Sequence, residues 1–230
     1  MTSALPAAVL WDMDGTLVDT EGYWMAAETA LVESFGGTWT HEQALTLVGS
    51  GLERSAEILQ EAGVRMSVTD IVDHLSDAVS RTLAEQGNPF RPGARELLAQ
   101  LKEAGVRTAL VTMSLRSMAD TVAGQMGFDA FDLVVAGDEV TRPKPFPDPY
   151  LQACAQLDVD PADAVALEDS PTGVRAAVAA GVATVGIPLM VSLTGAGADA
   201  VWPTLEGRTP ADLAEFHAAH RAARTTEVTR

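Results

Sequence analysis

The alternation of short apolar runs with helical patterns in the second half of the chain constrains the fold more than any other feature. The apolar runs have the length of strands and lie at residues 106–112, 133–136, 164–167 and 182–187. The helical patterns occupy residues 94–104, 115–126, 148–157 and 171–180. Such alternation is typical of a parallel sheet with helices on both faces. An earlier apolar run at 7–11 adds a strand, and residues 209–224 predict a final helix.

Residues 20–87 interrupt this pattern, because they contain helical signals only. Near their end, four apolar residues recur at every fourth position: Ile71, Leu75, Val79 and Leu83. This spacing predicts an amphipathic helix, which ends at Gly87. The following segment "NPFRPGA" is a Pro/Gly break that leads back to the alternating region. We therefore predict a Rossmann-like α/β core of residues 1–19 and 88–230, with residues 20–87 inserted as an α-helical cap.

Several helix starts carry capping signals. Thr40 followed by Gln43 has the pattern of a capping box. Asp148 is the expected N-cap of its helix, with Pro149 at the first helical position. Ser170 is the expected N-cap of the Ala-rich helix that follows "LED". These signals fix the helix boundaries more tightly than periodicity alone.

The composition of the chain limits which partners it is expected to bind and in which compartment it is expected to occur. The net charge of -17 disfavours nucleic acid and anionic membranes as partners, and it repels phosphorylated compounds at long range. No apolar stretch approaches the ~20 residues of a membrane span, and the opening residues lack the basic segment of a signal peptide. The single cysteine, Cys154, excludes an internal disulfide. We expect a cytoplasmic protein and a monomer, with a dimer as the alternative.

Polar residues follow the predicted strands at four places. These clusters are Asp12/Asp14/Thr16, Thr112/Ser114, Lys144 and Glu168/Asp169. Each cluster alone is explained by a turn, a helix cap or, for the lysine, an exposed surface. In an open parallel sheet, however, the carboxyl ends of the strands share one edge, where ligands bind. Their common position therefore predicts one site.

The carboxylates indicate a divalent metal. Asp12 and Asp14 lie two residues apart after an apolar run, so their side chains point to the same side. Two acids held close together ionise together only when a cation is present, and Mg²⁺ prefers oxygen ligands. Glu168 and Asp169 can complete the ligand shell. One aspartate is then available as a nucleophile and the other as a proton donor and acceptor.

Other residues in the clusters suit a phosphoryl group. Gly15 permits a tight turn, and the amides that follow it are expected to face phosphate oxygens. Gly15 and Thr16 are therefore candidate phosphate-binding residues. Thr112 precedes a helix start together with Met113 and Ser114, and helix N-termini bind anions.

Lys144 lies in "TRPKPFPDPY", where the prolines on either side stiffen the loop. A lysine held in place there can supply positive charge to a developing phosphoryl transition state. This would provide the local positive charge that an acidic protein needs to bind a phosphate.

The segments "DMDGTLVDT", "LVTMS", "RPKPFPDPYL" and "ALEDSPTGVRAA" resemble, in this order, the four motifs of the haloacid dehalogenase-like (HAD) hydrolase superfamily. The chain is most similar to the branch with a helical cap after the first strand, which contains β-phosphoglucomutases and sugar phosphatases. The resemblance spans essentially the whole chain. It implies a Rossmann-like core and a Mg²⁺ cofactor.

The resemblance also assigns roles to the aspartates. It implies that Asp12 is the nucleophile and forms an aspartyl-phosphate. Asp14 would be the acid/base, with its backbone carbonyl on the metal. Asp169 would be a metal ligand, with Glu168 beside it, directly or through water. Because dehalogenases of this fold lack an acid at the position of Asp14, its presence favours phosphate esters.

For the remaining motifs, the resemblance implies that Thr112 holds a phosphoryl oxygen and that Lys144 bridges the nucleophile and the phosphate. Arg116 follows Ser114 at a helix start and could reach a distal anionic group of the substrate; the alternative is an ordinary surface arginine.

The cap residues bear on substrate choice. Trp24 stands where β-phosphoglucomutases have a histidine, and Leu52 stands near the position of their phosphate-binding arginine, with Arg54 two residues away. Both differences weaken the interpretation as a mutase. Trp24 either stacks on a sugar face or packs in the cap.

Glu21, Gly49 and Ser55 are further candidates for the cap side of the cleft. Three other residues are expected to have no chemical role. We expect Cys154 in a helix core, and we expect His217 and His220 on a solvated helix face rather than in a metal site.

The sequence thus predicts a Mg²⁺-dependent phosphatase of a small phosphorylated metabolite, expected to be a sugar phosphate. A phosphosugar mutase is the enzymatic alternative, and it would pass the phosphate to a second hydroxyl instead of water. A non-catalytic phosphometabolite-binding protein is the third hypothesis. It predicts the loss of catalytic residues, whereas Asp12, Asp14, Lys144 and Asp169 are all present.

Overall fold

The computed structural model describes residues 3–228 and contains one six-stranded sheet in that range. Its strands are β1 (Ala8–Trp11), β2 (Arg107–Val111), β3 (Leu133–Val135), β4 (Ala164–Glu168), β5 (Ala183–Gly186) and β6 (Ala200–Val201). Every neighbouring pair is parallel, in the order β3-β2-β1-β4-β5-β6. The predicted parallel α/β sheet is therefore confirmed.

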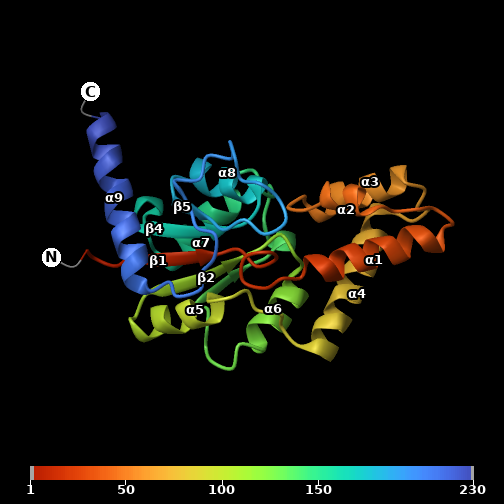
Figure 1. Cartoon of the computed structure of the whole chain (residues 1–230), viewed down its shortest axis with the longest axis horizontal. Coiled ribbons are helices and arrows are strands. Elements are labelled where there is room, and N and C mark those ends of the chain that lie inside the picture. Colours follow the sequence, from red (N-terminus) through yellow and green to blue (C-terminus); the bar gives the residue numbers. More distant parts are fainter. Residues whose placement is uncertain (1–2, 229–230) are drawn as a thin grey trace.

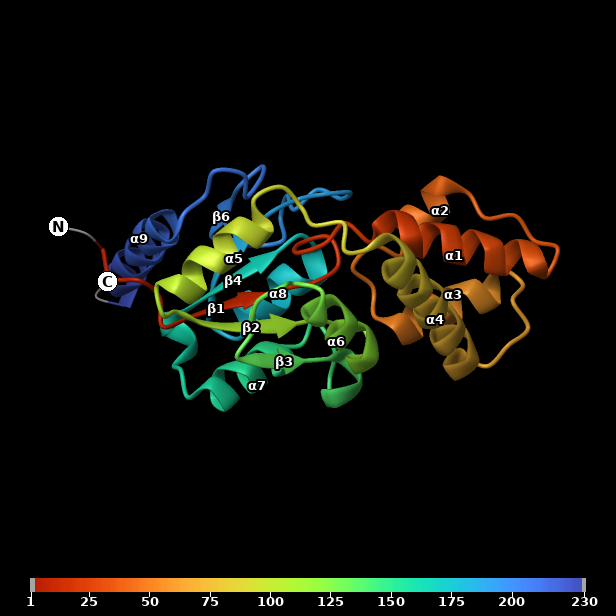
Figure 2. The ribbon, with the colours of Figure 1, turned by 90° about the horizontal axis from the view of Figure 1, so that it is seen from below.

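Helices cover both faces of the sheet (Figures 1 and 2). They are α5 (Ala94–Glu103), α6 (Arg116–Gly124), α7 (Asp148–Leu157), α8 (Pro171–Ala179) and α9 (Pro210–Val228), with two short 3-10 turns at Gly137–Glu139 and Pro161–Asp163. Val9 and Trp11 of β1 belong to the same buried cluster as residues of α5, α6 and α9. Ala8 and Leu10 belong to the cluster that contains α7 and α8. The alternation of side chains along β1 thus buries both faces of the strand.

The central strand β1 sets the edge at which the site forms. Trp11, its last residue, pairs with Leu110 of β2 and with Leu167 of β4. In Figure 2 the arrows of β1 and β2 point toward the cap. The residues just after β1, β2 and β4 therefore meet at one end of the sheet, below the cap.

The cap consists of four helices that lie together beyond this edge (Figure 1). They are α1 (Glu21–Ser34), α2 (His41–Leu45), α3 (Leu52–Glu61) and α4 (Val68–Gln86). The four predicted apolar residues of α4 are buried between these helices. The capping box of Thr40 and Gln43 is present at the start of α2, as predicted.

Two chain segments connect the cap to the core, and they are bonded to each other. Val18 forms an antiparallel bridge with Phe90. The amide of Asp19 donates to the carbonyl of Pro89 at 2.8 Å. Since these segments are the covalent connections between the two parts, motion of the cap relative to the sheet must occur around them.

Most predicted boundaries agree with the structure to within two residues. Ser170 caps α8 by accepting from the Gly173 amide at 3.0 Å, as predicted. The prediction for α7 is wrong by one position, because Pro147 is the N-cap and Asp148 is already helical. The two-residue strand β6 was not predicted, since it is too short to give a period. Cys154 is buried in α7, as predicted.

The prediction for His217 is wrong. Its side chain is buried at 5% exposure, and its Nε2 lies 3.0 Å from the carbonyl oxygen of Ala162. His220 lies 3.2 Å from Asp199 instead of pointing freely into solvent. Because α9 packs against the core, the helix face that carries these histidines is covered. The spacing of residues along the helix did not predict this contact. Within residues 3–228, the structure contains no helix with the length and apolar character of a membrane span.

Candidate active site

Asp12 lies immediately after β1 and is paired with Lys144. The Lys144 Nζ donates to Oδ1 of Asp12 at 2.7 Å and to the carbonyl of Val111 at 2.9 Å. Both side chains are buried. Burial alone would lower the pKa of Lys144, but the nearby Asp12 and Glu168 outweigh it and raise this pKa, so the lysine stays charged. The cation that the sequence predicted is therefore buried and in contact with the predicted nucleophile.

Glu168, the last residue of β4, is held by three donors. Its Oε1 accepts from Lys144 Nζ at 2.6 Å and from the Tyr150 hydroxyl at 2.5 Å. Its Oε2 accepts from the Ser170 hydroxyl at 3.3 Å. Glu168 thus gives the lysine a second carboxylate partner besides Asp12.

Asp169 is a buried carboxylate with an unsatisfied oxygen. The Thr16 hydroxyl donates to its Oδ1 at 3.3 Å, whereas its buried Oδ2 has no hydrogen-bond partner among the described residues. A Cβ on Gly15 would lie 2.0 Å from Oδ2, and Gly15 has a φ of +83°. Only glycine allows the turn after β1 to approach this carboxylate so closely.

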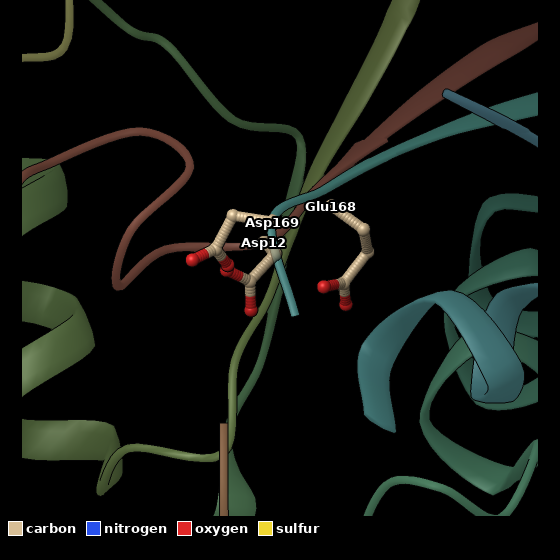
Figure 3. A group of neighbouring side chains, drawn as sticks. All are labelled: Asp12, Glu168 and Asp169. Atoms are coloured by element: carbon tan, nitrogen blue, oxygen red, sulfur yellow. The ribbon is translucent and has the colours of Figure 1, made fainter. Parts of the chain in front are cut away.

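Figure 3 shows how the three acids lie. The carboxylates of Asp12 and Asp169 converge, while the Glu168 carboxylate points to the other side. Ligand oxygens of all three residues lie within 4.8 Å of one another. Burial, and then repulsion by Asp12 and Glu168, raises the pKa of Asp169 well above its usual value. Burial, opposed by Lys144, raises the pKa of Asp12 to about 7.

This arrangement fits a hard divalent cation. Its donor atoms are carboxylate oxygens, which Mg²⁺ prefers. A cation between Asp12 and Asp169 would satisfy the unpaired Oδ2 and would favour the charged forms of both acids, which burial and the neighbouring acids disfavour. Glu168 lies within reach as well, but its oxygens are already engaged by Lys144, Tyr150 and Ser170.

Asp14 points away from this group, into the space between core and cap. Its Oδ2 accepts from the Ser114 hydroxyl at 2.6 Å. Its Oδ1 accepts from the Thr20 hydroxyl at 2.5 Å and from the Trp24 indole nitrogen at 3.1 Å. Trp24 is buried, and besides packing in the cap it makes this polar contact, which neither sequence interpretation of the residue included.

The Thr112 hydroxyl is oriented by the backbone. Its Oγ1 accepts from the Ser114 amide at 3.0 Å, which leaves its own proton free to point elsewhere. Met113 also borders the site, and its sulfur accepts from the Lys144 amide at 3.3 Å. All three residues of this predicted cluster line the same cleft.

The amides after Asp14 require a correction. The Gly15 amide donates to the Val18 carbonyl at 2.8 Å, and the Thr16 amide donates to the Met13 carbonyl at 3.3 Å. Both donors are used inside the turn, so they do not face phosphate oxygens as predicted. Gly15 and Thr16 instead support Asp169.

A cleft between core and cap contains most of the predicted residues. Its core side is lined by Asp12, Asp14, Thr112, Met113, Ser114, Lys144, Asp169 and Ser170. Its cap side includes Glu21, Trp24, Glu28, Gly49, Leu52 and Ser55. The cleft encloses about 90 Å³, which is far less than the ~300 Å³ at the lower end for ligand pockets. The structure is therefore a closed form, and the cap must move to admit a sugar phosphate.

Gly49 marks a direct contact between cap and core. The Thr172 hydroxyl, near the start of α8, donates to the Gly49 carbonyl. A Cβ on Gly49 would lie 2.6 Å from the Ser170 Cβ. Its placement on the cap side of the cleft agrees with the expectation from sequence.

Arg116 lies outside the cleft. It is exposed, and its guanidinium donates to Asp120 at 2.8 Å and to Glu139 at 2.9 Å. The structure therefore favours the alternative considered for this residue, an arginine of the surface.

Sequence reasoning missed three residues that line or support the site. Arg91 is buried, and its guanidinium donates to the carbonyls of Gly15 at 2.5 Å and Ile187 at 2.9 Å, which supports the turn after β1. Tyr150 orients Glu168. Glu28 lines the cleft seven residues after Glu21. Arg91 could have been suspected from the sequence, because it is a charged residue inside the Pro/Gly break. Nothing in the sequence pointed to Tyr150 or Glu28.

The family and its relatives agree with this geometry. The profile described as haloacid dehalogenase-like hydrolase matches residues 9–187. Protein CbbY of Cereibacter sphaeroides is 35% identical over 186 residues, covering 76% of this chain and 80% of the relative. The phosphorylated carbohydrates phosphatase of Thermotoga maritima is 33% identical over 182 residues, covering 76% and 82%.

A solved structure is similar over almost the whole chain. It is a mutant of CbbY from Rhodobacter sphaeroides in complex with xylulose-(1,5)bisphosphate. Its TM-score is 0.79 at 31% identity, covering 88% of this chain and 96% of that one. From the matched profile, the shared fold and these identities, the chain belongs to the haloacid dehalogenase-like hydrolase family.

Proposed function

We propose that the protein is a Mg²⁺-dependent phosphatase that hydrolyses a sugar monophosphate through an aspartyl-phosphate on Asp12. One observation carries this proposal: Asp12 faces the unsatisfied Asp169 carboxylate on one side and the buried Lys144 on the other. With these roles, a nucleophile, a cation and the ligands of a second cation would meet at one point.

Asp12 and Asp169 would hold the metal, with the backbone carbonyl of Asp14 as a further ligand by family resemblance. When bound, Mg²⁺ would neutralise negative charge on the phosphoryl oxygens and on the two aspartates.

In the first step, Asp12 attacks phosphorus. Its Oδ1 is occupied by Lys144, so Oδ2 is the oxygen available to form the bond. The Thr112 hydroxyl, which already accepts from the Ser114 amide, can donate its proton to a phosphoryl oxygen. The ammonium of Lys144 offsets the charge that develops in the transition state.

Asp14 acts as the proton donor and acceptor of the reaction. Protonated Asp14 gives its proton to the leaving alcohol as the oxygen–phosphorus bond breaks, and it then takes a proton from the water that attacks the aspartyl-phosphate. Both steps require that Asp14 exchange one of its present donors, Thr20, Trp24 or Ser114, for substrate or water. The closed cleft excludes bulk solvent during the transfer.

Two observations support the substrate class: the names of the relatives and the number of cationic side chains in the cleft lining. One relative is named a phosphatase of phosphorylated carbohydrates. CbbY was crystallised with a bisphosphate, but here the described cleft lining contains one cationic residue, Lys144, which is already paired. A second phosphate would find no cationic partner among the described residues of the cleft lining, which favours a monophosphate.

The same observation disfavours a mutase, whose bisphosphate intermediate needs a second phosphate site. Leu52 lines the cleft near the position of the expected arginine. Arg54 is exposed and paired with Glu57 at 2.8 Å.

The test is a phosphate-release screen over sugar phosphates and related esters, with Mg²⁺ and with EDTA. We expect free phosphate from one or more monophosphates, only with the metal. The screen includes β-glucose 1-phosphate with a trace of the 1,6-bisphosphate. Conversion to glucose 6-phosphate without free phosphate would establish the mutase instead. Binding without turnover of any ester would point to a binding protein.

A further inference from the structure

Glu21 is a buried carboxylate without a partner. It is 7% exposed and lines the cleft, and its side chain forms no hydrogen bond or ion pair with any described residue. It is the first residue of α1, where a helix dipole ordinarily favours an acid. That dipole explains an exposed acid at a helix start, but it does not explain why this side chain is largely buried in the cleft lining.

The surroundings of Glu21 are acidic. Burial raises its pKa to about 8, and the nearby charges that add to this effect belong to Asp14, Glu28, Asp12 and Asp19. The charges that act most strongly on Glu21 are all negative. An unpaired buried acid is costly, and this cost would be relieved by a positive charge that enters the cleft with the substrate.

Glu28 extends the acidic surface along the same face of α1. It is seven residues, or two helical turns, from Glu21, and it also lines the cleft. The Trp39 indole donates to its Oε2 at 3.3 Å and holds it in place. Its other oxygen has no such contact among the described side chains.

The space next to the cleft is acidic too. A neighbouring cavity of about 530 Å³ shares Ser50, Leu52, Met113 and Lys144 with the cleft. Its lining includes Glu53, Glu57 and Asp138. The one arginine in this lining, Arg54, is paired with Glu57. Because Lys144 is held by Asp12 and Glu168, the charged side chains that line this cavity also favour a cation over an anion.

Resting on the phosphatase function proposed above, we propose that the alcohol part of the substrate carries a protonated amine, which the Glu21 carboxylate binds. Glu28 adds negative potential along the same face of α1. The substrate class is then an aminated phosphate monoester, such as an amino-sugar phosphate, with its phosphoryl group on Asp12 and its ammonium on the cap. Neutral polyol phosphates would lack the ion pair.

The test compares matched esters that differ in one group. Glucosamine 6-phosphate is compared with glucose 6-phosphate and with N-acetylglucosamine 6-phosphate, and ethanolamine phosphate with ethylene glycol monophosphate. We expect kcat/KM for the amines to exceed that for the neutral partners by about tenfold or more, the size of one charge-assisted contact. Glu21→Gln should remove this preference, and Glu28→Gln should reduce it.

Glu33→Gln is the control, because Glu33 is exposed on the same helix and lies outside the cleft lining. It should leave the preference unchanged. Thermal unfolding of each variant separates misfolding from loss of recognition, and Glu28→Gln remains informative if Glu21→Gln fails to fold.

The outcomes separate this inference from the phosphatase proposal. Mg²⁺-dependent hydrolysis of p-nitrophenyl phosphate and of neutral sugar phosphates, with no preference for amines, would overturn the inference and leave the phosphatase standing. Equal loss of activity toward both members of a pair in Glu21→Gln would overturn it as well. If no ester at all is hydrolysed, the phosphatase proposal fails and this inference fails with it.

Discussion

The indole nitrogen of Trp24 donates to Oδ1 of Asp14 across the boundary between cap and core, at 3.1 Å. The other oxygen of Asp14 accepts from Ser114 of the core at 2.6 Å. The residue that we assign to proton transfer is therefore held from both sides when the cap is closed. When the cap moves, the indole of Trp24 moves with it. The position of the cap therefore controls whether Oδ1 of Asp14 is free to exchange a proton with substrate or water.

Trp24→Phe keeps the ring and removes the donor. Because a hydrogen bond to a charged group contributes about 1.5–3 kcal/mol, we expect kcat/KM to fall about tenfold through a weaker closed state. The thermal midpoint should fall by about 2–4 °C for each kcal/mol lost, with no further loss from packing because the ring still packs in the cap. Steady-state kinetics and thermal unfolding provide the two readouts. Trp202→Phe, distant from the cleft, is the matched control and should leave the kinetics unchanged.

Asp12→Asn removes the nucleophile with almost no change of shape. We expect Mg²⁺-dependent phosphate release to drop by a factor on the order of 10⁴ or more. The same variant should still bind the substrate, which calorimetry can measure. Turnover near the wild-type rate would exclude Asp12 as the nucleophile.

Lys144→Ala leaves Asp12 and Glu168 buried without their cation. Breaking a buried pair in this way costs about 3–5 kcal/mol, so urea denaturation should report a large loss in the free energy of unfolding. Arg142→Ala is the control two residues away, because its pair with Asp148 is largely exposed. It should have nearly the same stability as the wild type, and an equal loss in both variants would contradict the role given to burial.

The metal-free protein should lose stability as the pH rises. Burial raises the pKa of Glu21 to about 8 and those of Glu28 and Asp12 to about 7, from ordinary values of 4.5, 4.5 and 3.8. Between these values the folded state binds more protons than the unfolded chain. The protonated acids therefore contribute their full stabilisation below pH ~4, and this contribution disappears as the pH rises to ~8.

We expect the free energy of unfolding in EDTA to fall between about pH 5 and pH 8.5, by up to about 1.4 kcal/mol per pH unit for each group. Added Mg²⁺ should increase the free energy of unfolding most at the highest pH values of this range. Urea denaturation at several pH values measures both effects. Stability that rises with pH over this range would contradict the burial of these acids.

Arg91→Lys replaces a forked donor by a single ammonium, which cannot reach the carbonyls of both Gly15 and Ile187 in the same geometry. We expect a loss of about 1–3 kcal/mol in unfolding free energy and weaker Mg²⁺ binding, since Gly15 packs against Asp169. Arg95→Lys, which loses contacts to Met126 far from the cleft, should keep its Mg²⁺ affinity. Fluorescence titration with Mg²⁺ distinguishes the two.

The sequence by itself determined the features that depend on neighbours along the chain. The strands and helices after Asn88, the capping box at Thr40 and the cap of Ser170 follow from periodicity and local hydrogen bonding. The position of Asp12 and Asp169 at one sheet edge follows as well, because all parallel strands end on the same side.

Only the tertiary structure decided which side chains meet. Thr16 and Asp169 are 153 residues apart, and Lys144 and Asp12 are 132 residues apart. The burial of His217, the support of the turn by Arg91 and the contact of Trp24 with Asp14 likewise join separate elements. Such contacts depend on the faces that packed elements present to each other, and no local pattern of residues encodes that arrangement.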